Sequence, residues 1–354
     1  MNITINKTDF PKAKPADEGG LGFGKIFTDH MFVMDYSVEK GWYDPRIVPY
    51  APLELDPATT VLHYGQTIFE GLKAYRTKDD EILLFRPEKN MERINISNER
   101  LCIPPIDVDF GVKALKAFVD VERDWVPSSV GTSLYLRPFI IATDPFLGVH
   151  PSHTYKFIII ASPSGQYYPE GVNPVKIWVE SKYVRAVKGG IGYSKTAGNY
   201  AASLKAQKEA QDAKYTQVLW LDGIDRKYIE EVGTMNVFFV IDGEVITPKL
   251  QGSILPGITR LSVIELLRSQ GIKVTERVIS IQEVYDAHSE GRLDEAFGTG
   301  TAAVISPIGE LNWDGNKITI NNNKTGKIAQ STYNYITDLQ SGKIADIFGW
   351  TQKV

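Results

Sequence analysis

The hydrophobic pattern of the chain mixes short apolar runs, typical of strands, with longer stretches in which apolar residues recur at helical spacing. Strands are predicted at 27–36, 46–55, 133–142, 155–161, 176–183 and 216–222, and helices at 63–72, 88–100, 109–125, 199–214, 258–269, 281–290 and 326–340. Hairpins are predicted from 72–76 to 82–86, at Asp222-Gly223 and at Asp242-Gly243, and a break at Gly41 and Pro45. Because strands and helices alternate without a regular βαβ order, we predict an α+β fold.

The length of the chain and one proline-rich segment predict two domains. A chain of 354 residues is long for a single hydrophobic core. Residues 162–174 contain three prolines and two glycines between two predicted strands, which is the strongest boundary signal in the chain. We therefore predict an N-terminal domain over 1–162, a linker over 163–175 and a C-terminal domain over 176–354.

Composition excludes several classes of function. The net charge is -4 and no basic run occurs, so we expect no nucleic-acid partner. The longest apolar run, 157–161, is too short to span a membrane, and the polar N-terminus contains no signal peptide, so we expect a cytoplasmic protein. The single cysteine, Cys102, excludes an internal disulfide and is expected in the core. The five histidines show no His-x-x-x-His spacing, so structural roles and no metal site are expected.

The candidate chemistry begins at Lys195, which stands in a glycine-rich stretch just ahead of a predicted helix. A lysine amine normally has a pKa of about 10.4 and is a poor nucleophile at neutral pH. Burial and the positive end of a helix both lower that pKa, as Schiff-base chemistry requires. Taken alone, Lys195 is better explained as a solvated loop lysine, because most lysines beside glycines are solvated.

A rival interpretation of the same stretch is a phosphate-binding loop. Gly189 to Thr196 matches G-x-x-x-x-G-K-[ST] at every position except Ser194, which replaces the second glycine. The strand ending at Asp222 imitates the strand and aspartate that hold magnesium in such enzymes. An ATPase or kinase is therefore the rival hypothesis.

Three further stretches are suited to holding a phosphate. Leu255–Arg260 begins a helix with Pro-Gly at its turn, 298–302 is a Gly/Thr-rich turn, and Arg86 ends a strand. Taken singly, each stretch is better explained by structure alone, as a simple cap, a tight turn or a surface arginine. Between them lie Glu230 and Glu231, of which only one can face a pocket if both lie on a strand. A carboxylate at the ring nitrogen of pyridoxal phosphate makes the ring an electron sink, but spacing does not choose between the two.

Six motifs occur together and carry a resemblance: Tyr193–Tyr200, Glu231–Asn236, Leu255–Arg260, Gly300–Ala302, Phe69–Gly71 and Leu134–Pro138. With them, nearly the whole chain from Gly22 onward resembles the branched-chain amino acid aminotransferases, which are fold-type IV pyridoxal phosphate enzymes. The resemblance implies a two-domain fold like that of D-amino acid aminotransferase, with a smaller N-terminal α/β domain and a larger, barrel-like C-terminal domain. It also implies a homodimer.

The resemblance assigns the cofactor contacts. Lys195 would bind pyridoxal 5'-phosphate covalently and move the proton at the substrate α-carbon, and Glu231 would pair with the pyridine nitrogen. Tyr200 would hydrogen-bond the phenolic oxygen of the cofactor. The residues implied to hold the phosphate are Arg86, Ile258, Thr259 and Thr301.

The resemblance also assigns a substrate pocket for amino acids and 2-oxo acids. Thr234 and the backbone of Thr301 and Ala302 would bind the α-carboxylate. The apolar part of the pocket would be formed by Phe23, Tyr64, Phe69, Tyr135 and Tyr167, with Leu147 and Val149 entering from the partner subunit. Tyr135 and Arg137 are two residues apart on a strand and share a face, so Arg137 can reach the distal carboxylate of glutamate.

The implied reaction is a reversible, ping-pong transfer of the amino group between leucine, isoleucine or valine and 2-oxoglutarate, through pyridoxamine phosphate. D-amino acid aminotransferase and aminodeoxychorismate lyase are the alternatives within the fold, and a non-catalytic pyridoxal phosphate carrier is a more distant one. Residues 302–306 lack the Cys-x-x-Cys pair of mammalian members, so thiol regulation by that route is absent.

Overall fold

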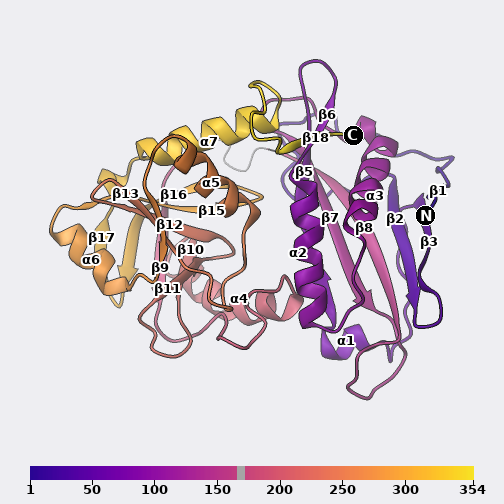
Figure 1. The fold of residues 1–354 in the computed structure, drawn as a ribbon, viewed down its shortest axis with the longest axis horizontal. Helices are drawn as coiled ribbons and strands as arrows, with labels where there is room; N and C mark the ends of the chain where they lie inside the picture. Colours follow the sequence, from indigo (N-terminus) through magenta and orange to yellow (C-terminus); the bar gives the residue numbers. More distant parts are fainter. Residues whose placement is uncertain (166–171) are drawn as a thin grey trace. The chain divides into compact units, whose positions relative to one another are not determined.

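The computed structural model describes residues 1–165 and 172–354, and the described chain divides into two compact units. The first unit contains residues 1–165 together with 194–197 and 338–354 (Figure 1). Its sheet has the order β1-β3-β2-β8-β7-β5-β6-β18, with β4 paired to β7. The strands are β1 Thr4–Ile5, β2 His30–Ser37, β3 Gly41–Pro49, β4 Thr67–Phe69, β5 Leu72–Arg76, β6 Ile82–Phe85, β7 Ser133–Ala142, β8 Thr154–Ser164 and β18 Thr351–Lys353.

Helices α2 (Pro87–Arg100) and α3 (Val108–Val121) lie side by side on one face of this sheet (Figure 1). Their apolar positions recur at helical spacing, so each helix turns one stripe toward the sheet and buries it in a shared core with β2, β5, β7 and β8. The Asp107 side chain accepts a hydrogen bond from the Phe110 N–H at 2.7 Å and caps α3. The predicted helix at 88–100 and the predicted strand at 133–142 are thereby confirmed. The helix predicted at 109–125 is present but ends at Val121, and Arg123–Trp125 form a separate 3-10 turn.

Three expectations for this unit are wrong. The predicted helix at 63–72 is a single turn, α1 (Thr60–Tyr64), after which β4 pairs with β7, because sheet pairing outweighs the local helical pattern. Pro45 does not break the chain but lies inside β3, beside an irregularity in the β2–β3 register where no backbone N–H is needed. Cys102 is exposed, with a φ of 56° directly after α2.

The last residues of the chain return to the first sheet. β18 pairs antiparallel with β6, and the Trp350 carbonyl accepts a hydrogen bond from the Arg86 N–H at 2.7 Å. The predicted division into 1–162, 163–175 and 176–354 did not include this return of the C-terminal residues to the first sheet. The division itself stays a prediction.

The second unit contains residues 172–193 and 198–337, and its sheet has the order β11-β10-β9-β16-β15-β12-β13-β14, with β17 paired to β16. Its strands are β9 Val175–Glu180, β10 Gln217–Leu221, β11 Ile229–Val232, β12 Asn236–Ile241, β13 Glu244–Pro248, β14 Val274–Arg277, β15 Leu293–Gly300, β16 Val304–Trp313 and β17 Asn316–Thr319. Its helices are α4 Ala197–Asp212, α5 Ile258–Ser269, α6 Ile281–Ser289 and α7 Lys327–Gln340, the first and last of which run across a unit boundary.

The core of this unit lies between the sheet and its helices. Residues of β12, β15 and α6 share one cluster, while α4 packs Ala206 and Ala210 against Trp220 of β10. The Asp242-Gly243 turn joins β12 to β13 with positive φ at both residues, as its hairpin signal predicts. Two mostly antiparallel sheets with helices packed on them confirm the predicted α+β class. No helix in the described ranges has both the length and the apolar character needed to cross a membrane.

A buried ion pair fixes the segment between β4 and β5. Arg93 of α2 donates from Nε and Nη2 to the two oxygens of Glu70 at 2.7 and 2.8 Å, and Asn90 donates to the same carboxylate at 2.7 Å. Burial alone raises the pKa of Glu70, but the charge and hydrogen bonds of Arg93 and the charge of Lys195 lower it below the usual range. Glu70 is therefore ionised and holds its neighbour Phe69 in place.

We expect Glu70→Gln to lower the free energy of unfolding by ~3–5 kcal/mol at neutral pH, because Arg93 is left buried without its counter-charge. Since the pKa of Glu70 is lowered on folding, this stabilisation is complete above the unfolded carboxyl pKa of about 4.3 and is lost as the pH falls through the folded value. Denaturant unfolding at pH 7 and at acid pH measures both effects. The control is Glu92→Gln in the exposed pair with Lys89, which changes stability by less than about 1 kcal/mol. Equal losses in the two variants would contradict the argument.

Candidate functional site

The backbone of Lys195 is fixed on both sides within the first unit. Its N–H donates to Ser97 Oγ at 2.9 Å, and its carbonyl accepts from the Phe69 N–H at 2.9 Å. The next residue, Thr196, donates from Oγ1 to the Thr67 carbonyl at 2.7 Å. Lys195 is thus attached to α2 and β4 immediately before α4 begins at Ala197, which confirms its predicted place ahead of a helix.

Side chains of the predicted substrate pocket lie around the Lys195 amine. Lys195 Nζ is 4.8 Å from the centre of the Phe69 ring, and the Arg137 guanidinium carbon is 4.7 Å from the same ring. Arg137 donates from Nη2 to Tyr135 Oη at 3.0 Å, so these two side chains share a face of β7 as their spacing predicts. The Phe23 ring packs edge-on against Tyr135 at 4.8 Å. Five predicted residues therefore form one continuous set of contacts.

Two residues, Gly71 and Lys73, lie next to Tyr135, and their proximity to it follows from the fold and not from the sequence alone. A Cβ on Gly71 would lie 2.0 Å from Tyr135 Oη, so only glycine fits after Glu70. Lys73 pairs with Tyr135 across β5 and β7, which places its side chain on the same sheet face. Burial lowers the pKa of Lys73 to about 8. Sequence reasoning missed Lys73 because its only signal was a lysine inside an apolar strand.

Arg86 is held by the end of the chain. It is 6% exposed and adopts a φ of 48° at the start of α2. Its guanidinium carbon lies 5.0 Å from the centre of the Trp350 ring. Trp350 was not among the predicted residues, since only the pairing of β18 with β6 brings it there.

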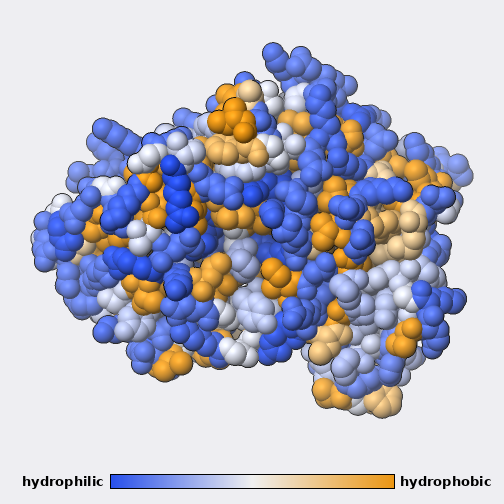
Figure 2. All heavy atoms as spheres, in the orientation of Figure 1, coloured by the Kyte–Doolittle hydropathy of each residue, from blue (hydrophilic) through white to orange (hydrophobic). Residues whose placement is uncertain are grey.

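The remaining predicted residues of the first unit lie at a loop between β7 and β8. Tyr64 Oη donates to the Leu147 carbonyl, whereas the Leu147 and Val149 side chains are 65% and 82% exposed. Figure 2 shows orange hydrophobic side chains at the lower edge of this unit, where Figure 1 places the loop beside α1. Tyr167 lies outside the described residues.

In the second unit, Glu231 of β11 is buried against an arginine. Glu231 Oε1 accepts a hydrogen bond from the Leu255 N–H at 2.7 Å and lies 3.2 Å from Arg185 Nη2. The two side chains are 4% and 8% exposed. Arg185 also donates to the carbonyls of Gly192 and Ser253, which fixes its position. Sequence reasoning missed Arg185, because only the fold brings it to β11.

The residues after Glu231 position the start of α5. Val232 and Met235 exchange backbone hydrogen bonds around the Gly233-Thr234 turn, where Gly233 has a φ of 59°. Asn236 then donates from Nδ2 to the Leu255 carbonyl at 2.9 Å, and a Cβ on Gly257 would lie 2.0 Å from Asn236 Oδ1.

Helix α5 begins at Ile258 without a side-chain cap among the described residues. The N–H groups of its first turn, which includes Thr259, are therefore suited to bind an anion, and the helix dipole favours negative charge there.

A second turn lies at the same end of this sheet. β15 and β16 pair up to Gly300 and Val304, so Thr301 and Ala302 form the tip between them. Asn236 pairs with Thr299 on the neighbouring strand, which places Thr234 and Thr301 at one sheet end. Tyr200 lies on α4 in the same unit. The second unit therefore brings together Glu231, Thr234, Ile258, Thr259, Thr301 and Ala302.

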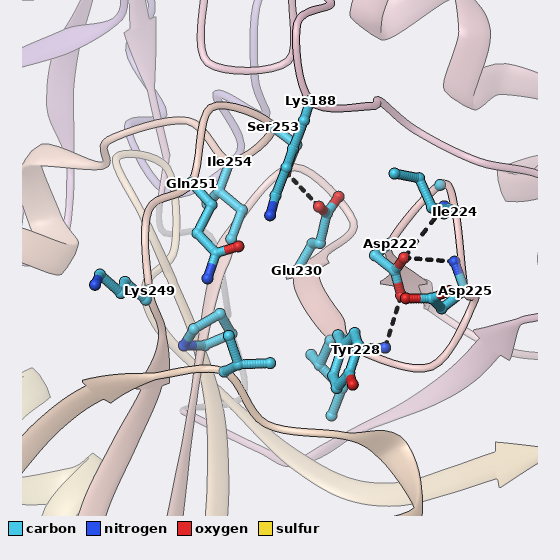
Figure 3. A pocket seen from close by; sticks show the side chains of 14 residues that line it. Lys188, Asp222, Ile224, Asp225, Tyr228, Glu230, Lys249, Gln251, Ser253 and Ile254 are labelled. Carbon is cyan, nitrogen blue, oxygen red and sulfur yellow. Dashed lines mark hydrogen bonds between the residues drawn. The ribbon is translucent and has the colours of Figure 1, made fainter.

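Glu230 turns away from Glu231, toward a separate cavity of about 400 Å³. Ser253 Oγ donates to Glu230 Oε1, while Oε2 is buried and makes no hydrogen bond to a described residue. Figure 3 shows the Glu230 carboxylate beside Ser253, with Lys188 and Ile254 nearby and Asp222 held by backbone N–H groups. None of the predicted site residues that the structure describes lines this cavity. Burial raises the pKa of Glu230.

Comparisons with known proteins agree on one family. The family model described as amino-transferase class IV matches residues 67–311. The chain is 63% identical to branched-chain-amino-acid aminotransferase 2 of Bacillus subtilis, over 100% of this chain and 97% of that protein. Among solved structures it is similar to the Escherichia coli branched-chain amino acid aminotransferase, with a TM-score of 0.76, 28% identity and coverage of 92% and 98%. The branched-chain aminotransferase of Thermoproteus uzoniensis with norvaline matches with a TM-score of 0.76, 27% identity and coverage of 92% and 99%. The predicted fold-type IV architecture is thereby confirmed.

The raised pKa of Glu230 predicts that Glu230→Gln stabilises the protein at neutral pH. A carboxyl whose pKa is higher in the folded state stabilises the fold at low pH. That contribution to the free energy of unfolding is lost as the pH rises from about 4.3 through the folded pKa. We expect the melting temperature of the variant to exceed that of the parent by roughly 2–4 °C at pH 7–8, equivalent to ~1 kcal/mol, and to match it near pH 4. Glu244→Gln is the control, because a hydrogen bond from Lys273 lowers the pKa of Glu244 and reverses the sign. A parent more stable than the Glu230 variant at pH 8 would refute this.

Proposed function

Because the chain belongs to the class IV aminotransferase family and is a transaminase, we propose that it moves an amino group reversibly between a branched-chain L-amino acid and 2-oxoglutarate. Both half-reactions would use one site in ping-pong order. The names of the similar bacterial proteins support leucine, isoleucine and valine as the amino donors. We further propose that the enzyme acts in the cytoplasm.

The observation that carries the cofactor assignment is the sheet end of the second unit. A buried carboxylate, Glu231, lies there with the first turn of α5 and the Thr301 turn. This set fits pyridoxal 5'-phosphate, whose ring nitrogen binds an acid and whose phosphate binds backbone N–H groups and hydroxyls. Two solved structures of one similar branched-chain aminotransferase, with pyridoxamine 5'-phosphate and with N-(5'-phosphopyridoxyl)-L-glutamate, support the same cofactor. When bound, this cofactor supplies an electron sink for the bond to the substrate α-carbon.

Each cofactor-binding residue would then have one task. Glu231 would pair with the ring nitrogen, and its ion pair with Arg185 would hold that carboxylate in position. Tyr200 would hydrogen-bond the phenolic oxygen. The phosphate would be held by Arg86, Ile258, Thr259 and Thr301.

Lys195 would carry the covalent attachment and move the proton at the substrate α-carbon. Its two peptide hydrogen bonds fix the backbone, so the amine moves by rotation of its side chain alone, which suits a group that must bind and release. The neighbouring ring of Phe69 keeps water from one side of the amine.

For the substrate, we propose that Arg137 binds the distal carboxylate of glutamate while the aromatic rings beside it receive an aliphatic side chain. The contact between Arg137 and Tyr135 supports this, because it places a cation and an apolar ring on one face. The other proposed pocket residues are Phe23, Tyr64, Phe69 and Tyr167. Thr234, Thr301 and Ala302 would hold the α-carboxylate.

The exposed Leu147 and Val149 side chains support a homodimer in which each subunit completes the site of the other, because apolar groups at a loop tip favour burial against a partner. The phosphate-binding-loop enzyme finds no support in the family match. The D-amino acid aminotransferase and lyase alternatives share the fold, and substrate assays separate them.

Lys195→Ala is expected to lower transamination of leucine and 2-oxoglutarate by at least ~10⁴-fold, because no other group can replace the proton-transferring amine. Lys188→Ala, an exposed lysine in the same glycine-rich stretch, is the control and should retain activity. Glutamate formation and the visible absorption of the bound cofactor are measured together. Cofactor absorption without glutamate formation in the parent protein would favour a non-catalytic pyridoxal phosphate carrier. An active Lys195→Ala variant would overturn the assignment of Lys195 as the catalytic lysine.

Arg137→Leu should separate the two substrates. Losing a hydrogen-bonded charge pair of ~1.5–3 kcal/mol should raise the KM for 2-oxoglutarate by roughly 10–100-fold. The KM for leucine should change by less than about threefold, since no charge binds its side chain. Steady-state kinetics in both directions test this, with Arg123→Leu at the surface as the control. Equal effects on both substrates would show that Arg137 has only a structural role.

A further inference from the structure

Three side chains converge where the loop between β7 and β8 begins and ends. Asp144, His150 and His153 each offer a ligand atom, and these atoms all lie within 4.8 Å of one another. Asp144 Oδ2 is 3.3 Å from His150 Nε2 and 2.9 Å from His153 Nδ1. His150 and His153 are three residues apart and lack the His-x-x-x-His spacing of a helical metal motif, so only structural roles were predicted for them from the sequence.

The contacts of His150 direct its Nε2 toward Asp144. Nδ1 of His150 lies 2.9 Å from the Gly148 carbonyl, which can only accept a hydrogen bond, so Nδ1 is the donor in this contact. Nε2 then faces the carboxylate oxygen Oδ2 of Asp144 at 3.3 Å, so a nitrogen and an oxygen that can both bind a cation lie side by side. A backbone carbonyl that binds one ring N–H while the other ring nitrogen binds the ion is the usual outer support of a metal-bound histidine.

Hydrogen bonds hold the carboxylate of Asp144 in place. Oδ2 accepts a hydrogen bond from the His153 N–H at 2.7 Å, and Oδ1 accepts one from Thr154 Oγ1 at 2.8 Å. Two imidazoles and a backbone N–H thus converge on one oxygen. A single ion shared by both rings satisfies them with fewer contacts at that oxygen.

We propose that Asp144, His150 and His153 bind one divalent transition-metal ion, with Zn²⁺ as the best match. Zn²⁺ binds imidazole nitrogen and carboxylate oxygen at about 2.0–2.2 Å, and a tetrahedron with such bonds has edges of about 3.3 Å. The 3.3 and 2.9 Å separations around Asp144 Oδ2 are close to that edge. The imidazole pair disfavours Ca²⁺ and Mg²⁺, which prefer oxygen ligands. His153, whose side chain is 69% exposed, leaves room for water in the fourth position.

The bound ion would stiffen the tip of the loop. The Phe146 ring packs edge-on against His150 at 4.7 Å, and Tyr64 holds the Leu147 carbonyl. An ion attached to His150 therefore restrains the segment that carries Leu147 and Val149. This effect on catalysis rests on the proposed function, in which those two side chains enter the site of the partner subunit.

Zinc titration of the cofactor-loaded enzyme, stripped of metals by a chelator, tests the site by calorimetry. We expect one Zn²⁺ per chain, with affinity at least tenfold weaker in both His150→Ala and His153→Ala. His288→Ala, a histidine of the second unit that contacts the Thr319 carbonyl, and Cys102→Ser, at the one exposed thiol, are matched controls that should bind as the parent does. Co²⁺ in place of Zn²⁺ should show the intense visible bands of a tetrahedral site.

Unchanged binding in both histidine variants, or no Zn²⁺ binding by the parent at micromolar concentrations, would overturn the proposal. Binding does not require turnover, so this result is independent of the proposed function. The KM for leucine is then measured with and without Zn²⁺. A shift of at least twofold in the parent, absent in His153→Ala, supports the effect on the loop, whereas an unchanged KM in the parent with bound zinc overturns that effect.

Discussion

The ion pair between Glu231 and Arg185 is the constraint on which the second unit's candidate site depends. Both side chains are almost fully buried, and a buried charge without its partner costs several kcal/mol. Glu231 also accepts the Leu255 N–H, and Arg185 donates to the Ser253 carbonyl. The segment 253–255 is therefore bound to both members of the pair. Because α5 begins only a few residues later, the ion pair determines where the helix N-terminus lies relative to the carboxylate.

The first unit uses a similar device. Glu70 and Arg93 are buried together. Phe69, the residue before Glu70, makes two contacts with Lys195, one through its backbone N–H and one between its ring and the lysine amine. The residue after it, Gly71, leaves room for Tyr135. In both units a buried carboxylate thus lies within the motif that carries the chemistry.

The sequence predicted those elements whose pattern is settled locally. The strand at 133–142 and the helix at 258–269, which has a Pro-Gly start, both occur as predicted. The sequence predictions failed where pairing with a distant strand determines the secondary structure. An example is β4, whose residues have a helical pattern but pair with β7. Trp350 and Arg185 reach Arg86 and Glu231 only through the fold. The candidate roles came from motif resemblance, since spacing did not choose between Glu230 and Glu231.

The adjacency of those two glutamates has a physical consequence. Strand alternation turns Glu231 toward Arg185 and Glu230 toward the cavity, and both are bound by the same segment, through Leu255 N–H and Ser253 Oγ. Glu231 is paired with a buried arginine, while burial raises the pKa of Glu230. The two acids therefore lie next to each other in different electrostatic surroundings. Ser253 joins their networks, because its hydroxyl donates to Glu230 and its carbonyl accepts from Arg185, the partner of Glu231.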